Sequence, residues 1–129
     1  MLFVGDIVTI KEFKNPKLRY QVVRTEHYHN GNHIYALIRV DTESVSTAVM
    51  SPYIEDELEL LERYHSSIKR LVKEFDYEDI VITSINHVRI TGKIIAIKKS
   101  LWNSRVQYKL DTSNQWFYVS QLKDCKGGI

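Results

Sequence analysis

The chain is poor in cysteine, proline and glycine. Its 129 residues include one cysteine, two prolines and five glycines. The single Cys125 excludes an internal disulfide framework and a cysteine-rich zinc site, and we interpret it as incidental. No run approaches the roughly 18–20 apolar residues that cross a bilayer. The first residues lack the basic and long apolar regions of a signal peptide. We therefore expect a cytoplasmic protein with no membrane association.

Signatures of catalysis are also missing. The glycines form no phosphate-binding loop, because only Gly127 and Gly128 are adjacent. No serine, histidine and aspartate are spaced as a catalytic triad. The acidic residues 55–57, with Glu59 and Glu62, fall at a turn or a first helical turn, where carboxylates are favourable without any function. We expect a protein that is not an enzyme and that binds no cofactor.

Charge is divided unevenly along the chain, although the net charge is only +2. Residues 1–54 carry six basic and five acidic side chains, a balance of +1. Residues 55–79 carry four and nine, or −5, and residues 86–129 carry eight and two, or +6. An acidic middle followed by a basic end is typical of a nucleic-acid-binding half, although small surfaces also vary by chance.

Two parts of the chain repeat one order of short β-branched segments, which predicts a duplicated β unit. Asp6–Ile10 begins the first part and Asp79–Thr83 begins the second. Two unrelated β meanders would share this pattern. The predicted strands are residues 6–10, 20–25, 35–42 and 45–50 in the first half and 79–83, 92–97, 106–112 and 116–119 in the second. Asn30-Gly31 predicts a two-residue hairpin turn, and Pro16 and Pro52 fall outside the predicted strands.

One segment has helical spacing. Its apolar stripe consists of Tyr64, Ile68, Leu71, Val72 and Phe75. Either one helix begins at Pro52, or residues 57–61 form a strand before a shorter helix. We favour the strand, because a helix of about 24 residues would be twice the usual length. The stripe either covers the β units or pairs two copies of the chain, so we expect a monomer or a weak dimer.

Several of these features together resemble a Src-homology-3-like small β-barrel. They are the opening Gly5-Asp6-Ile7-Val8, a long hairpin, a strand that ends in Asp, and a turn before residues 56–60. Residues 91–97 resemble the glycine-centred core of a KOW motif, as found in ribosomal and transcription-elongation proteins. The resemblance implies a mostly β fold with one helix, in which two small barrels of the KOW/Tudor type follow each other.

The predicted domains are a barrel over residues 1–61, a connecting helix over 62–76 and a second barrel over 77–129. Barrels of this class bind proteins, RNA or DNA and rarely catalyse a reaction. Fold alone does not fix function, so the side chains must decide between these ligands.

Three histidines in seven residues, His27, His29 and His33, raise the question of a metal site. A two-residue turn would place His27 and His29 on one face of the hairpin and His33 on the other. Only an odd-length loop or a bulge would bring all three together. We expect no metal site, and we interpret the segment as an exposed hairpin tip that contacts a partner.

The second half combines cations with aromatic rings, the residue types that bind phosphates and stack on bases. Rings and arginine are equally enriched at protein interfaces. The candidates for nucleic-acid binding are Arg89, Lys93, Lys98, Lys99, Trp102, Arg105, Tyr108 and Lys109. The candidates for protein contact are His27, Tyr28, His29, His33, Trp102 and Arg105.

The sequence favours a non-enzymatic protein that binds a macromolecular partner, most simply another protein. Its short length and its richness in Lys, Ile, Tyr and Asn resemble small bacteriophage or mobile-element proteins that inhibit host machinery such as defence nucleases. The alternative is a nucleic-acid-binding protein that uses the basic second half, with an affinity that falls as salt rises.

Overall fold

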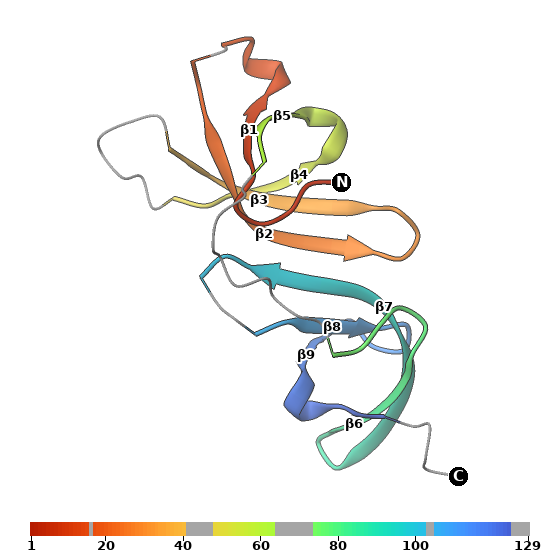
Figure 1. Ribbon diagram of the computed structural model, residues 1–129. Coiled ribbons are helices and arrows are strands. Elements are labelled where there is room, and N and C mark those ends of the chain that lie inside the picture. The colour runs from red at the N-terminus through yellow and green to blue at the C-terminus, as the bar shows by residue number, and fades with distance from the viewer. Residues whose placement is uncertain (16, 41–47, 64–73, 103–104, 125–129) are drawn as a thin grey trace.

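Strands make up most of the computed structural model, which describes residues 1–15, 17–40, 48–63, 74–102 and 105–124 (Figure 1). The first-half elements are β1 (Ile7–Ile10), η1 (Lys11–Phe13), β2 (Tyr20–Tyr28), β3 (His33–Arg39), β4 (Met50–Ile54), η2 (Glu55–Glu57) and β5 (Leu58–Glu62), where η marks a 3-10 turn. The second-half elements are β6 (Ile80–Ile85), β7 (Val88–Ser100), β8 (Gln107–Leu110), β9 (Trp116–Tyr118), η3 (Val119–Gln121) and β10 (Lys123–Asp124). The predicted mostly β composition is confirmed.

The predicted fold of two closed barrels joined by a helix is wrong. The strands form one open antiparallel sheet with the order β10-β6-β7-β2-β1-β5, from which β3 and β4 branch at β2 and β8 and β9 branch at β7. Within the described ranges β4 does not pair with β5, nor β9 with β10, so neither half closes. The physical reason lies in β2 and β7. Residues 24–28 of β2 and 96–100 of β7 each have an edge that no described strand of their own half covers, and the backbone groups of these two edges pair with each other.

No helix of seven or more residues occurs in the described part of the chain. Most of the predicted helix over 62–76, namely residues 64–73, lies outside the described residues. At its two ends, Glu62 belongs to β5 and residues 74–76 are not helical. The alternative in which residues 57–61 form a strand is confirmed, because β5 pairs with β1 from Ile10↔Leu58 onward.

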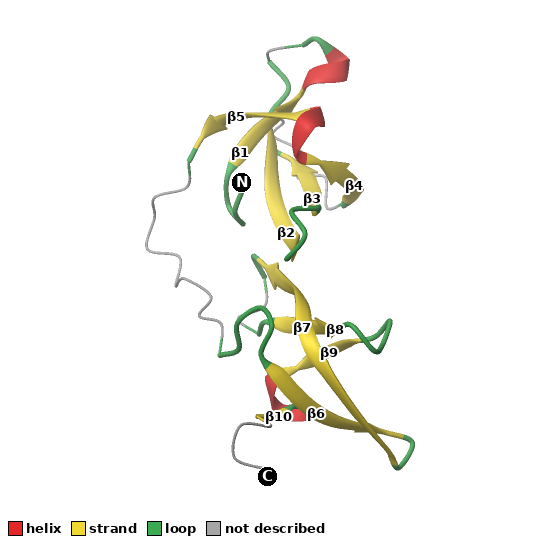
Figure 2. Ribbon diagram, turned by 90° about the vertical axis from the view of Figure 1, so that its right-hand side faces the viewer, coloured by secondary structure: helices red, strands yellow, loops and turns green. Residues whose placement is uncertain are grey.

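The two halves repeat one strand order, as the sequence predicted. In each half four strands follow as an antiparallel meander, a 3-10 turn comes next, and a last strand returns to the first one. Figure 2 shows the two units one above the other, with β2 and β7 between them. Each unit has a core of its own. The first core contains Leu2, Val8, Ile10, Tyr20, Val22, Tyr35, Leu37 and Leu58, and the second contains Val81, Ile94, Ile97, Val106, Tyr108, Leu110, Phe117 and Leu122.

The junction between the halves is a strand pairing. β2 and β7 are antiparallel from Arg24↔Ser100 to Tyr28↔Ala96. Backbone hydrogen bonds extend the pairing at both ends, from His29 N to Ile95 O at 2.8 Å and from Leu101 N to Val23 O at 2.7 Å. The hydroxyl of Tyr77 adds a bond to the His27 carbonyl at 2.9 Å. The halves therefore share a continuous backbone hydrogen-bond network.

Two local predictions need correction. Pro52 lies inside β4, where a proline is tolerated because β4 pairs only with β3 within the described residues. The fourth strand begins at Met50, later than the predicted 45–50, of which residues 45–47 lie outside the described part. The β6–β7 connection is a two-residue turn at Asn86 and His87, both with positive φ, and it was not predicted.

Candidate functional site

One face of the sheet around the junction combines aromatic and basic side chains. Residues that pair directly across neighbouring strands point to the same side. The register runs from Glu26 through Lys98 to Gln107 and Tyr118, and in the next row from Tyr28 through Ala96 to Lys109 and Trp116. We call this the aromatic–basic face. Its side chains are Arg24, Glu26, Tyr28, Lys98, Gln107, Lys109, Trp116 and Tyr118, together with Arg105 just before β8.

Cations lie over the rings of this face. The Lys98 Nζ atom is 5.0 Å from the ring centroid of Trp116. The Lys109 Nζ atom is 5.5 Å from the Tyr28 ring and 5.8 Å from the Trp116 ring. The rings of Tyr28 and Trp116 meet edge to face, with centroids 6.3 Å apart. Side chains from both halves therefore form one contact cluster across the junction.

The face is positively charged. Arg24, Lys98, Arg105 and Lys109 carry four positive charges, and Glu26 carries one negative charge. Glu26 Oε1 lies 3.7 Å from Lys98 Nζ, and each side chain is 20% exposed. Glu26 therefore offsets only part of the positive charge, and the remaining cations give the half-exposed face a net attraction for anions.

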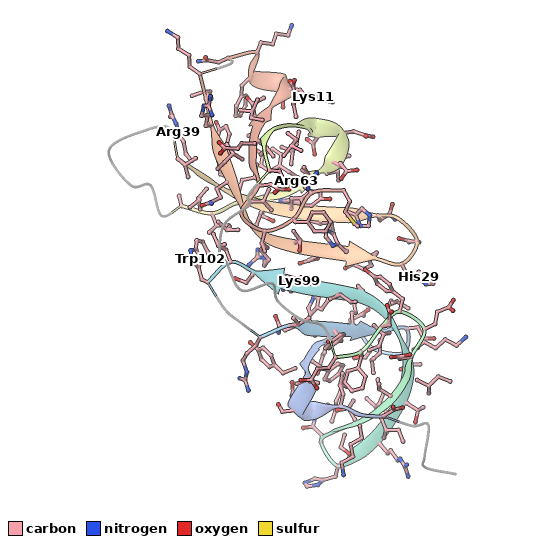
Figure 3. The ribbon with its side chains drawn as sticks, in the orientation of Figure 1. Lys11, His29, Arg39, Arg63, Lys99 and Trp102 are labelled. Atoms are coloured by element: carbon pink, nitrogen blue, oxygen red, sulfur yellow. The ribbon has the colours of Figure 1, made fainter. Side chains whose placement is uncertain are left out.

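Arg105 extends this face toward the β7–β8 loop, and Trp102 lies in that loop outside the ring contacts of the face. The Arg105 guanidinium lies 4.7 Å from the ring of Tyr118. Trp102 is 63% exposed, the highest value among the large apolar residues that the structure describes. In Figure 3 Trp102 lies at one end of the junction and His29 at the other.

The structure separates the predicted nucleic-acid-binding residues. Lys98, Lys109 and Arg105 share the aromatic–basic face, whereas Lys99 pairs with Thr25 and points to the opposite side. Tyr108 is 1% exposed and belongs to the second core, where its hydroxyl accepts hydrogen bonds from Glu74 N and Phe75 N. It offers no ring to a ligand.

Arg89 and Lys93 lie at the other end of β7, where the strand pairs with β6. Arg89 borders a hollow of about 450 Å³ at the edge of the second half. The hollow is lined by Ile82, Thr83, Ser84, Arg89, Gln121 and Lys123. It shares no residue with the aromatic–basic face.

The histidine prediction is wrong in its geometry. His27 pairs with His33, so the loop between Tyr28 and Asn32 has three residues. This odd length puts His27 and His33 on one side, with ring centroids 4.8 Å apart. His29 instead stacks on Tyr77 at 5.1 Å. His27 is 7% exposed and is unavailable as a partner contact, whereas His29 is exposed at the hairpin tip.

The N-terminal segment covers His27. The His27 Nε2–H donates to the Leu2 carbonyl at 3.0 Å, and the ring meets Phe3 and Tyr35 edge to face. Burial is the main cause that lowers the pKa of His27 to about 4, and the neighbouring His33 contributes to the same lowering. His27 therefore packs among rings in the interior of the first half.

A buried tyrosine connects the same segment to the first core. The Tyr35 hydroxyl accepts from Leu2 N at 3.1 Å and donates to Glu55 Oε1 at 3.0 Å. Burial alone would raise the pKa of Glu55, but the bonds from the Met1 amine and from Tyr35 outweigh it, and the pKa is lowered. Glu55 therefore has a structural role, in keeping with the interpretation of the acidic run.

In the described ranges no three His, Cys, Asp or Glu residues are arranged to hold a metal ion. The same part of the chain contains no helix that is long and apolar enough to cross a membrane. Comparison with protein families, curated proteins and solved structures finds no match for this chain.

Five residues of the face, Gln107 among them, were missed from the sequence as site residues. Arg24, Glu26, Trp116 and Tyr118 were treated as ordinary strand positions, with Trp116 in a buried strand. The available signal was alternation, because three consecutive rings in one strand cannot all face the core, and the structure buries Phe117 between Trp116 and Tyr118. Arg24 and Glu26 gave no such signal, since their place depends on the β2–β7 pairing.

Proposed function

We propose that the chain is a nucleic-acid-binding protein whose aromatic–basic face contacts the phosphate backbone. The observation that carries the proposal is the placement of Lys98, Lys109 and Arg105 beside half-buried rings on one face, where Glu26 is the one carboxylate among the described side chains. Neutralised phosphates release counterions, so such a surface binds nucleic acid with strong salt dependence.

The test is fluorescence anisotropy with labelled single-stranded and duplex DNA and RNA at about 50 and 200 mM salt. We expect binding that weakens by at least tenfold between the two salt concentrations. The variant Lys98→Gln/Lys109→Gln should bind more weakly and show a shallower salt slope. The matched control is Arg89→Gln/Lys123→Gln, which removes the same charge at the hollow. Equal losses in both variants, or no binding by the wild type at low salt, would refute the proposal.

A second candidate function is contact with a protein partner through Trp102. A tryptophan that is 63% exposed is a residue type that often dominates binding energy at interfaces. A partner held by the wild type and lost by Trp102→Ala would support this function. The partner's identity and the comparison with bacteriophage inhibitors stay predictions that no observation here tests.

A further inference from the structure

The aromatic rings of the proposed site are occupied by the protein's own cations. Lys98 lies over Trp116, Lys109 lies between Trp116 and Tyr28, and Arg105 lies over Tyr118. Each ring therefore has a charged group where a flat ligand would stack. A group that stacks on Trp116 or Tyr28 has to displace an ammonium group first.

We infer that the ligand is a single strand, and that its unpaired bases replace the ammonium groups of Lys98 and Lys109 on the rings of Trp116 and Tyr28. The inference rests on the proposed nucleic-acid binding and adds the class of nucleic acid and the exchange. A displaced ammonium group stays on its flexible stem within reach of the incoming backbone. It exchanges a partly exposed cation–π contact for a contact with a phosphate.

The arrangement of the rings favours a single strand over a duplex. Tyr28 and Trp116 are inclined at 71° with centroids 6.3 Å apart. Two bases that stack on these rings are turned by a similar angle relative to each other. Neighbouring bases in a duplex stay nearly parallel and keep their faces covered, whereas an unpaired strand splays its bases onto separate rings.

The exchange predicts that one variant changes the affinities for two ligands in opposite directions. Lys109→Met removes the Lys109 ammonium group from both rings, leaves that of Lys98 over Trp116 and keeps a side chain of similar length. A nucleoside without phosphate should then bind more tightly, because it no longer has to displace the Lys109 ammonium group from the Tyr28 ring. An oligonucleotide should bind more weakly, because a phosphate contact is lost.

The experiment measures binding of a labelled 12-nucleotide single strand, of its duplex and of adenosine to the full chain. We expect the wild type to prefer the single strand to the duplex at least tenfold. The affinity for the single strand should fall at least tenfold in Trp116→Ala and severalfold in Tyr28→Leu. Trp102→Ala is the matched control for removal of a tryptophan and should change little. Circular dichroism verifies that each variant is folded, and Tyr28→Leu keeps the test open if Trp116→Ala unfolds.

For Lys109→Met we expect severalfold tighter adenosine binding and severalfold weaker oligonucleotide binding. The salt slope should fall by about 0.7 for the single strand. Equal binding of duplex and single strand, or weaker adenosine binding by Lys109→Met, would overturn the exchange and leave the proposed function standing. No binding of any oligonucleotide by the wild type would overturn both.

Discussion

His27 is a polar side chain that is buried in the interior of this protein. It is surrounded by the rings of Phe3, His33 and Tyr35, and its one described hydrogen bond goes to the Leu2 carbonyl. A carbonyl only accepts, so Nε2 carries the proton in the neutral ring. Protonation would place a positive charge in an apolar environment, which explains the lowered pKa.

This environment predicts a loss of stability in acid. The pKa of His27 is about 4 in the folded chain against 6.5 for an ordinary histidine, so the unfolded chain binds more protons between these values. The free energy of unfolding should therefore be fully retained above pH 6.5 and fall as the pH drops toward 4. One such group contributes at most about 3 kcal/mol, because one pKa unit corresponds to about 1.4 kcal/mol.

Urea unfolding at a series of pH values measures the effect. His27→Gln should flatten the curve between pH 4 and 6.5, whereas the exposed His87→Gln should leave it unchanged. An unchanged pH dependence in His27→Gln would show that other groups cause the acid loss.

At the scale of elements, Gly92 allows the chain after β8 to pass close to β7. A Cβ atom at this position would lie 2.5 Å from Thr112 Oγ1, 2.9 Å from Asp111 Oδ1 and 3.1 Å from Leu110 Cβ. The same two polar side chains bond the backbone on either side of the glycine. Thr112 Oγ1 donates to Thr91 O, and Asp111 Oδ1 accepts from Lys93 N, both at 2.9 Å.

Gly92→Ala should therefore destabilise the chain by about 1–3 kcal/mol, because the new methyl group collides with side chains that are held by these bonds. Thermal or urea unfolding measures the change. Thr91→Ala, at an exposed neighbour on the same strand, should cost much less. Equal costs for the two variants would show that the close approach at Gly92 does not matter.

The whole molecule consists of two cores connected through the β2–β7 pairing. The pairing covers Arg24 to Tyr28 and Ser100 to Ala96, and Tyr77 adds a bond from the second half to the His27 carbonyl. A half that unfolded alone would leave the backbone groups of its partner strand unpaired. We therefore expect the two halves to unfold together.

Tryptophan fluorescence tests this cooperativity, because both tryptophans, Trp102 and Trp116, lie in the second half. Leu37→Ala in the first core and Leu110→Ala in the second remove fully buried side chains and should each cost about 2–5 kcal/mol. Leu37→Ala should shift the fluorescence midpoint as much as the circular dichroism midpoint. A fluorescence midpoint that does not move would show independent halves.

The sequence predicted what depends on neighbours along the chain. Alternation of apolar and polar residues and runs of β-branched residues located most strands, including β5. The same patterns located the repeat. The junction was not predictable in this way, because Glu26 and Lys98 pair across 72 residues and no local pattern marks that register. The prediction of closed barrels was wrong for the same reason, because the β2–β7 pairing has no local signal in the sequence. Tyr108 looked like a site residue because its neighbour Lys109 is basic, whereas alternation places the two on opposite faces.

The predicted length of the loop that contains Asn30-Gly31 was wrong by one residue, and this error changed the predicted geometry of the histidines. One additional loop residue reversed the side to which His33 points relative to His27. The aromatic–basic face was half anticipated, because its cations stood out by charge. Trp116 and Tyr118 did not stand out, since rings in strands are more often buried.

The antiparallel pairing of β2 with β7 joins equivalent strands of a repeated unit, which is the relation found at a two-fold interface between identical subunits. The side chains do not obey this symmetry. Beyond β7 the face continues with Gln107 and Lys109, but beyond β2 the paired positions are Ile34 and Ala36. The backbone thus offers two equivalent places for a ligand while the side chains equip only one. Under the proposed function, a bound strand should accordingly occupy the protein with a stoichiometry of one and lie across it in a single polarity.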